Sequence, residues 1–152
     1  MVREFKLQTK THEEIKLGEH MFILPLSDEG ILSFSEASEH YQNEIAEAND
    51  FDPETGTGEE LREKFEILRE IAAGFINTII IHEDPDVQET EDNFSIVYEE
   101  LGRSLQNTFE FIAYLSNIYN EHMDESQKKS QALAVNKNAK NNKNVRNVPS
   151  KR

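Results

Sequence analysis

The five histidines are the side chains of this sequence best suited to metal binding or proton transfer. They stand at His12, His20, His40, His82 and His122. A metal site on one helix needs ligands three or four positions apart, and no two of these histidines have that spacing. The chain also has no cysteine, which excludes thiol catalysis and sites built on thiolates. The sequence therefore predicts no metal site and no cofactor.

Two acidic loops have the composition of calcium-binding loops but not their spacing. The loop that begins at Asp50 has glycine at the seventh position, and Leu61 stands at the twelfth, where a bidentate carboxylate is required. The loop that begins at Asp84 has Glu89 in place of the glycine and Ser95 at the twelfth position. Both are predicted to be solvated loops, where any ion binding would be weak.

The motifs of common enzymes are also missing. The segment Thr55–Gly58 has the glycines of a phosphate-binding loop but no lysine, and Glu59 and Glu60 follow it and would repel a phosphate. No serine stands in a G-x-S-x-G context. Carboxylates are so numerous that a chance pair carries little information, although a small enzyme with converging carboxylates stays open as an alternative. We predict a protein that is not an enzyme and has no catalytic residues.

The charge of the chain changes abruptly after Glu125. All 30 acidic residues precede this point and meet eight Lys and Arg, so residues 1–125 carry a net charge of −22. Residues 126–152 contain no acid and carry +8. The first part has the apolar periodicity of a folded domain, whereas the second is rich in Lys and Asn and poor in apolar residues. We therefore predict an acidic, helix-rich domain over residues 1–125 and a disordered basic tail over residues 126–152.

Apolar spacing and turn residues predict a hairpin followed by helices. Alternating apolar residues predict strands over Glu14–Leu17 and Met21–Leu26, joined by a turn at Gly18. Helical periodicity then predicts a helix at Ile31–Ala48, entered through Ser27-Asp28-Glu29, and a helix at Glu59–Ile81, whose β-branched end is also typical of a strand. An acidic loop is expected at His82–Asp92. A short helix at Asn93–Leu101, closed by Gly102, and a last helix from Ser104 to about Met123 complete the domain. The expected fold is mainly α (α+β), with a small N-terminal hairpin and a bundle of about four helices.

The last predicted helix is apolar over a wider arc than one packing face needs. The simpler interpretation is that it is the central helix of the bundle. The alternative is that one edge of the helix, formed by Phe111, Tyr114 and Ile118, binds a partner. These three residues are the candidate partner-binding site.

The order of these elements resembles the tail assembly chaperones of long-tailed bacteriophages, especially those of Gram-positive hosts. The resemblance covers most of residues 12–123. It rests on these segments: Ile15-Lys-Leu-Gly18, Met21-Phe-Ile-Leu-Pro-Leu26, Ser27-Asp28-Glu29, the Glu59–Ile81 helix, Tyr98-Glu-Glu-Leu-Gly102 and Phe109-Glu-Phe-Ile-Ala-Tyr-Leu115.

The resemblance implies a non-enzymatic protein that binds the tape-measure protein and helps to recruit the tail tube protein during tail assembly. It also implies self-association and absence from the mature virion. An acidic DNA mimic or adaptor that inhibits a nucleic-acid-binding enzyme is the alternative, because the carboxylates of residues 1–125 could follow the charge pattern of a duplex, although the basic tail would partly neutralise such a surface. The acidic part would itself repel nucleic acid. The longest apolar run, Phe75–Ile81, is too short to span a bilayer, and Met1–Lys10 lacks the apolar core of a secretory signal. We therefore expect the host cytoplasm and no membrane contact.

Overall fold

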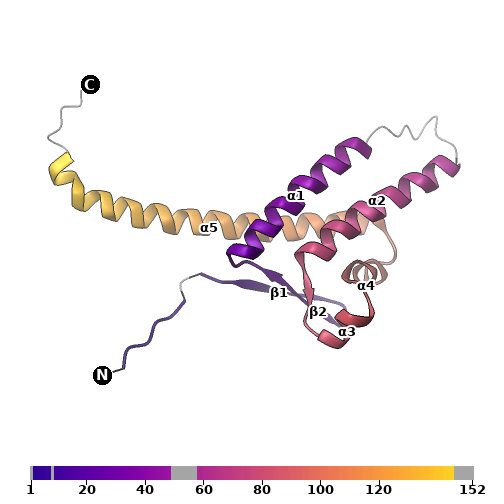
Figure 1. Cartoon of the computed structure of the whole chain (residues 1–152), viewed down its shortest axis with the longest axis horizontal. Helices are drawn as coiled ribbons and strands as arrows, with labels where there is room; N and C mark the ends of the chain where they lie inside the picture. Colours follow the sequence, from indigo (N-terminus) through magenta and orange to yellow (C-terminus); the bar gives the residue numbers. More distant parts are fainter. Residues whose placement is uncertain (1, 8, 49–57, 146–152) are drawn as a thin grey trace. The chain divides into compact units, whose positions relative to one another are not determined.

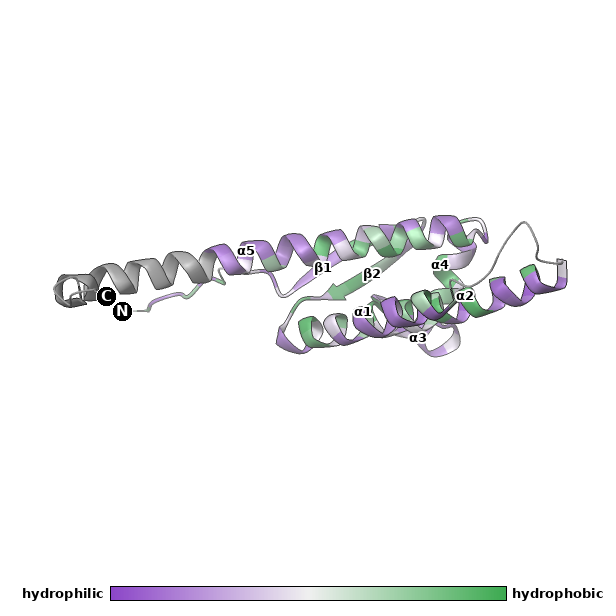
Figure 2. Ribbon diagram, turned by 90° about the horizontal axis from the view of Figure 1, so that it is seen from above, coloured by the Kyte–Doolittle hydropathy of each residue, from purple (hydrophilic) through white to green (hydrophobic). Residues whose placement is uncertain are grey.

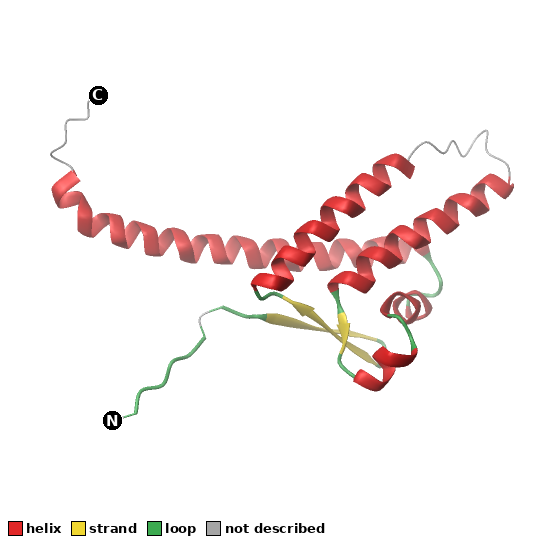
Figure 3. Cartoon of the chain, in the orientation of Figure 1, coloured by secondary structure: helices red, strands yellow, loops and turns green. Residues whose placement is uncertain are grey.

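The chain combines a small antiparallel sheet with long helices (Figures 1 and 3). The computed structural model describes residues 2–7, 9–48 and 58–145. The chain divides into two compact units, Met1–Ser116 and Asn117–Arg152. The first unit contains the sheet, helices α1 to α4 and the beginning of α5. This arrangement confirms the predicted α+β class, with a hairpin that precedes the helices.

The predicted hairpin is confirmed, with a first strand that begins two residues earlier and a second strand shifted by one residue. β1 (His12–Leu17) and β2 (His20–Pro25) are antiparallel, and Leu17 lies opposite His20 across a two-residue turn. Gly18 in that turn has φ +62°, a conformation that glycine adopts without strain. A short third strand, β3 (Ile81–His82), pairs with β2 on its other side. The β-branched end of the predicted Glu59–Ile81 helix therefore supplies both the last turn of a helix, which ends at Ile79, and the start of the edge strand β3.

Helices α1 (Asp28–Ala48) and α2 (Gly58–Ile79) pack side by side and lead away from the sheet (Figure 1). The Ser27 hydroxyl accepts a hydrogen bond from the Gly30 backbone N–H at 3.3 Å, at the start of α1. Asp28 and Glu29 lie in the first turn of α1, where negative charge is favoured by the helix dipole. The two helices match the predicted ones closely, although the sequence gives α1 a narrow apolar stripe and α2 a strong one.

An aromatic cluster holds the first unit together where α1, α2 and α5 meet. The Phe75 ring lies 5.5 Å from the Phe34 ring and 4.9 Å from the Tyr41 ring, measured between centroids. The Tyr41 ring also lies 6.4 Å from that of Phe109. Burial raises the pKa of the Tyr41 hydroxyl to about 12, so this side chain is neutral at physiological pH. The cluster is therefore an apolar core in which the hydroxyl carries no charge.

The predicted acidic loop at His82–Asp92 is wrong in part, because it contains a short helix, α3 (Pro85–Thr90). Asp84 caps this helix: its carboxylate accepts a hydrogen bond from the Asp86 backbone N–H at 3.0 Å, and Pro85 follows at the first helical position. Asp followed by Pro is a favourable helix start, and this signal outweighed the acidic composition. α4 (Asn93–Glu100) follows as predicted, with Asp92 as its cap.

The last helix, α5, is much longer than predicted and runs from Leu105 to Val145. It passes through the boundary at residues 116 and 117, so the second unit, within the described residues, is helical. Residues 126–145 are helical where the sequence predicts a disordered tail, and residues 146–152 lie outside the described ranges. The physical reason is that no Gly or Pro interrupts residues 104–148 and that Ala, Leu, Lys and Gln propagate an existing helix well.

Replacing two helical glycines, Gly30 and Gly74, with alanine should change the free energy of unfolding in opposite directions. A Cβ at Gly30 would lie 2.5 Å from the Pro25 carbonyl oxygen and 2.6 Å from its carbon, whereas a Cβ at Gly74 would meet nothing within 4 Å. We expect Gly30→Ala to lower the free energy of unfolding by about 1–3 kcal/mol through overpacking against backbone. Gly74→Ala should raise it by about 0.5–1 kcal/mol. Urea unfolding of both variants measures this, and equal stabilities would show that α1 does not approach the hairpin this closely.

Candidate partner-binding surface

The apolar stripe of α2 extends beyond the core that covers it. Ala72, Ile76 and Ile79 are at most 3% exposed and belong to the core. Leu61 and Phe65 lie on the same side of the helix, since steps of three, four and seven residues keep all five within an arc of about 60°. Yet Leu61 is 41% exposed and Phe65 is 48% exposed. In Figure 2, hydrophobic segments recur along α2 between hydrophilic ones.

Leu61 and Phe65 therefore form the uncovered end of a core stripe, and we call these two residues the α2 stripe end. Exposed apolar residues that continue a core stripe offer a partner a packing face, which singly scattered apolar residues do not. Ile67 is 47% exposed and offers a contrast. It lies about 140° around the helix from the centre of the stripe. Exposure alone does not distinguish Ile67 from Phe65, but position on the helix does.

Charged side chains lie on both sides of the α2 stripe end. The exposed carboxylates of this half of the helix are on the side opposite the stripe, more than about 110° from its centre, at Glu59, Glu60, Glu63, Glu66 and Glu70. Arg62, Lys64 and Arg69 lie closer, within about 90° of the centre of the stripe. Charge therefore does not select a partner here, and the apolar stripe itself favours an apolar helical segment.

The structure separates the three residues predicted to bind a partner. Phe111 is buried in the first unit, and its ring stacks on that of Tyr114 with centroids 6.3 Å apart. Tyr114 is 52% exposed. Ile118 belongs to the second unit and is half-buried. Of the three, Tyr114 is therefore the residue with a largely accessible surface.

Replacing Tyr114 should separate binding from stability. We expect Tyr114→Ala to change the free energy of unfolding by less than about 1 kcal/mol, because the side chain is exposed. If this edge takes part in binding, the same substitution should weaken partner association. Circular dichroism during thermal unfolding gives the first quantity, and a binding titration gives the second. A loss of several kcal/mol in stability would show that Tyr114 is a core residue.

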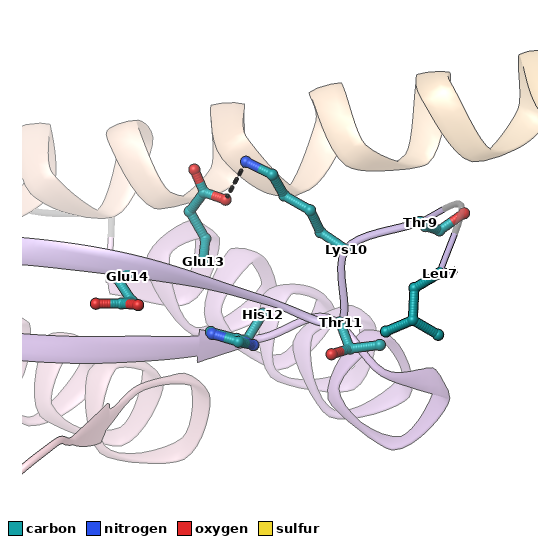
Figure 4. Close-up of a pocket in the computed structure, with 7 residues that line it drawn as sticks. All are labelled: Leu7, Thr9, Lys10, Thr11, His12, Glu13 and Glu14. Carbon is teal, nitrogen blue, oxygen red and sulfur yellow. Dashed lines mark hydrogen bonds and ion pairs between the residues drawn. The ribbon is translucent and has the colours of Figure 1, made fainter. Parts of the chain in front are cut away.

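The N-terminal segment forms a hollow of about 570 Å³ beside β1 (Figure 4). Its wall includes Leu7, His12 and Glu14, and Lys10 pairs with Glu13 at 3.3 Å. These side chains do not converge on one point in Figure 4. Within residues 2–7, 9–48 and 58–128, whose side chains are described, no three His, Asp or Glu form a group that could hold a metal ion. Nor do the described helices include one long and apolar enough to cross a membrane.

The sequence did not reveal the exposure of the α2 stripe end, although its periodicity identified the stripe itself. The Asp50 loop, considered above for calcium, lies mostly outside the described residues.

No protein-family model, curated protein or solved structure matches this chain.

Proposed function

We propose that this protein is a non-enzymatic assembly chaperone that covers an apolar helical segment of a partner. The observation that supports this proposal is the α2 stripe end, where Leu61 and Phe65 continue the core stripe but stay exposed. An amphipathic helix of a partner would complete the packing that the chain's own core provides further along α2. The exposed carboxylates on the opposite side of α2 keep the unoccupied protein soluble.

The partner that fits best is the tape-measure protein of a long-tailed phage, with recruitment of the tail tube protein as the second step. The basis for this choice is the resemblance of residues 12–123 to tail assembly chaperones. A tape-measure protein is a long helical chain with apolar stretches, and such stretches aggregate when they are unpaired. A chaperone needs affinity for these stretches but no catalytic group.

Co-expression tests the proposed function. The full chain should be produced together with the long helical protein encoded by the neighbouring gene of the same genome. We expect that protein to be soluble and to co-purify with the chain, and to aggregate when it is expressed alone. Equal insolubility with and without the chain would contradict the proposal. Capture of a nucleic-acid-binding enzyme, released by added DNA, would support the DNA-mimic alternative instead.

A second copy of the chain is the other occupant that the α2 stripe end could have. Light scattering of the purified chain at several concentrations distinguishes the two cases. A dimer that dissociates when tape-measure segments are added would place both partners on the same surface. A dimer that keeps its mass in their presence would place self-association elsewhere.

A further inference from the structure

Two histidines far apart in the sequence form a direct hydrogen bond in the first unit. His20 begins β2, His82 ends β3, and His20 Nδ1 lies 2.9 Å from His82 Nε2. The rings are nearly perpendicular, and His82 also packs edge-on against the Phe22 ring. His82 is only 7% exposed, whereas His20 is half-buried. The bond therefore ties β2 to the segment that leads into α3.

A neighbouring backbone group fixes where the protons of this pair must be. The Asp84 backbone N–H donates to His82 Nδ1 at 2.9 Å, so that nitrogen carries a lone pair. A neutral His82 then holds its proton on Nε2 and donates it to His20 Nδ1. Neutral His20 in turn holds its proton on Nε2. Each ring is thus restricted to a single tautomer.

The chain of contacts ends at a carboxylate on α4. His20 Nε2 lies 3.7 Å from Glu100 Oε1, close enough for an ion pair once His20 is charged. Gly18 makes room for this carboxylate, because a Cβ at Gly18 would clash with Glu100 Oε2. The contacts therefore connect the Asp84 amide to His82, His82 to His20, and His20 to Glu100.

The other charged groups near the pair are mostly acidic. His20 and Glu100 line a hollow of about 350 Å³ together with Glu91, Glu99 and Arg103. Arg103 pairs with Glu99 at 2.6 Å. On the other side, Glu83 donates its backbone N–H to the Met21 carbonyl, and Asp84 caps α3. Carboxylates therefore face the His20 side of the pair, and the Asp84 amide faces the His82 side.

We propose that the His20–His82 pair is a proton-operated lock on the N-terminus of α3. If one proton is added at His20 Nδ1 and the rings stay in contact, His20 becomes the donor, and His82 Nε2 gives up its proton to become the acceptor. The proton that left Nε2 then resides on His82 Nδ1, where it faces the Asp84 N–H. Two donors cannot share a hydrogen bond, so the amide loses its acceptor. Protonation therefore removes the hydrogen bond from the Asp84 N–H to His82 and adds an ion pair between His20 and Glu100.

The consequence is confined to the segment around α3. This helix has six residues and is too short to be stable alone, so it depends on its N-terminal contacts. The Gln88 side chain still accepts from the His82 backbone N–H at 2.9 Å, and that bond does not involve the rings. We therefore expect acidification to loosen the Asp84 end of α3 while the hairpin and the α1–α2 pair persist.

Nuclear magnetic resonance of the isotope-labelled full chain tests the lock between pH 8 and pH 5, the range in which histidine changes charge. At pH 8 both rings should show the Nε2–H tautomer, and the Asp84 amide should be protected from hydrogen exchange. Towards pH 5, protection of that amide, corrected for intrinsic exchange, should fall at least about tenfold, the change expected for about 1.4 kcal/mol. An Asp84 amide whose protection does not change would overturn the proposal.

Three variants make the test specific. Glu100→Gln removes the ion pair, so the loss of Asp84 protection should move to lower pH. His20→Gln keeps an acceptor for His82 but removes the His20 proton site, and it should also extend protection to lower pH. His40→Gln is the matched control, because exposed His40 pairs with Glu44 at 3.1 Å and touches neither ring; it should leave the midpoint unchanged. Identical midpoints in all three variants would contradict the lock.

Discussion

Phe75→Ala is expected to lower the free energy of unfolding by about 3–5 kcal/mol, enough to unfold much of a marginally stable domain. Phe75 is 3% exposed and contacts the rings of both Phe34 and Tyr41. Its removal leaves a cavity between α1 and α2 and also removes two aromatic contacts, each worth about 0.5–1.5 kcal/mol beyond area burial. Urea unfolding followed by circular dichroism measures the loss.

Phe65→Ala is the matched control for this prediction, since it makes the same change on the same helix at a side chain that is 48% exposed. We expect it to cost less than about 1 kcal/mol. Equal losses for the two variants would mean that the core stripe of α2 is covered along its whole length. The partner-binding surface proposed above would then not exist.

Phe65→Asp is expected to weaken binding of a tape-measure segment at least about thirtyfold, which corresponds to about 2 kcal/mol. The substitution places a carboxylate in the centre of the α2 stripe end, where the partner would have to bury it without a matching charge. The free chain should tolerate the change, because the side chain faces solvent when no partner is bound. Isothermal titration calorimetry with the full chain gives the affinity.

Ile67→Asp tests whether the loss depends on position. Ile67 and Phe65 are almost equally exposed, at 47% and 48%, and both lie on the exterior of α2. Aspartate has the same low helix propensity at either place, so changes in folding stability should be similar. Binding should change less than about twofold in Ile67→Asp. If the two variants weaken binding equally, the effect comes from added charge and not from the stripe.

Much of the first unit could be predicted because its signals are local. Gly18 supplies the turn of the hairpin, and the spacing from Leu61 to Ile79 gives α2. The sequence prediction missed α3 because it relied on acidic composition and gave the Asp84-Pro85 start signal too little weight. The length of α5 was missed because charge and composition were used to predict disorder, whereas helix propagation depends on propensity and on an existing nucleus.

The contacts of the candidate sites could not be predicted, because they depend on tertiary structure. His20 and His82 are 62 positions apart, and only the pairing of β2 with β3 brings their rings to 2.9 Å. Phe111 and Tyr114 are both aromatic and three residues apart, yet one is buried and the other is exposed. A periodic pattern identifies a stripe, but tertiary packing decides how much of the stripe is covered.

The most direct test of the proposed function is the affinity of the purified full chain for overlapping segments of the tape-measure protein from the same genome. We predict that at least one apolar helical segment binds with a dissociation constant of about 1 μM or tighter, near −8 kcal/mol. We also predict that Phe65→Asp abolishes most of this binding while Ile67→Asp preserves it. Absence of binding by every segment, with the chain folded and the segments helical, would contradict the account.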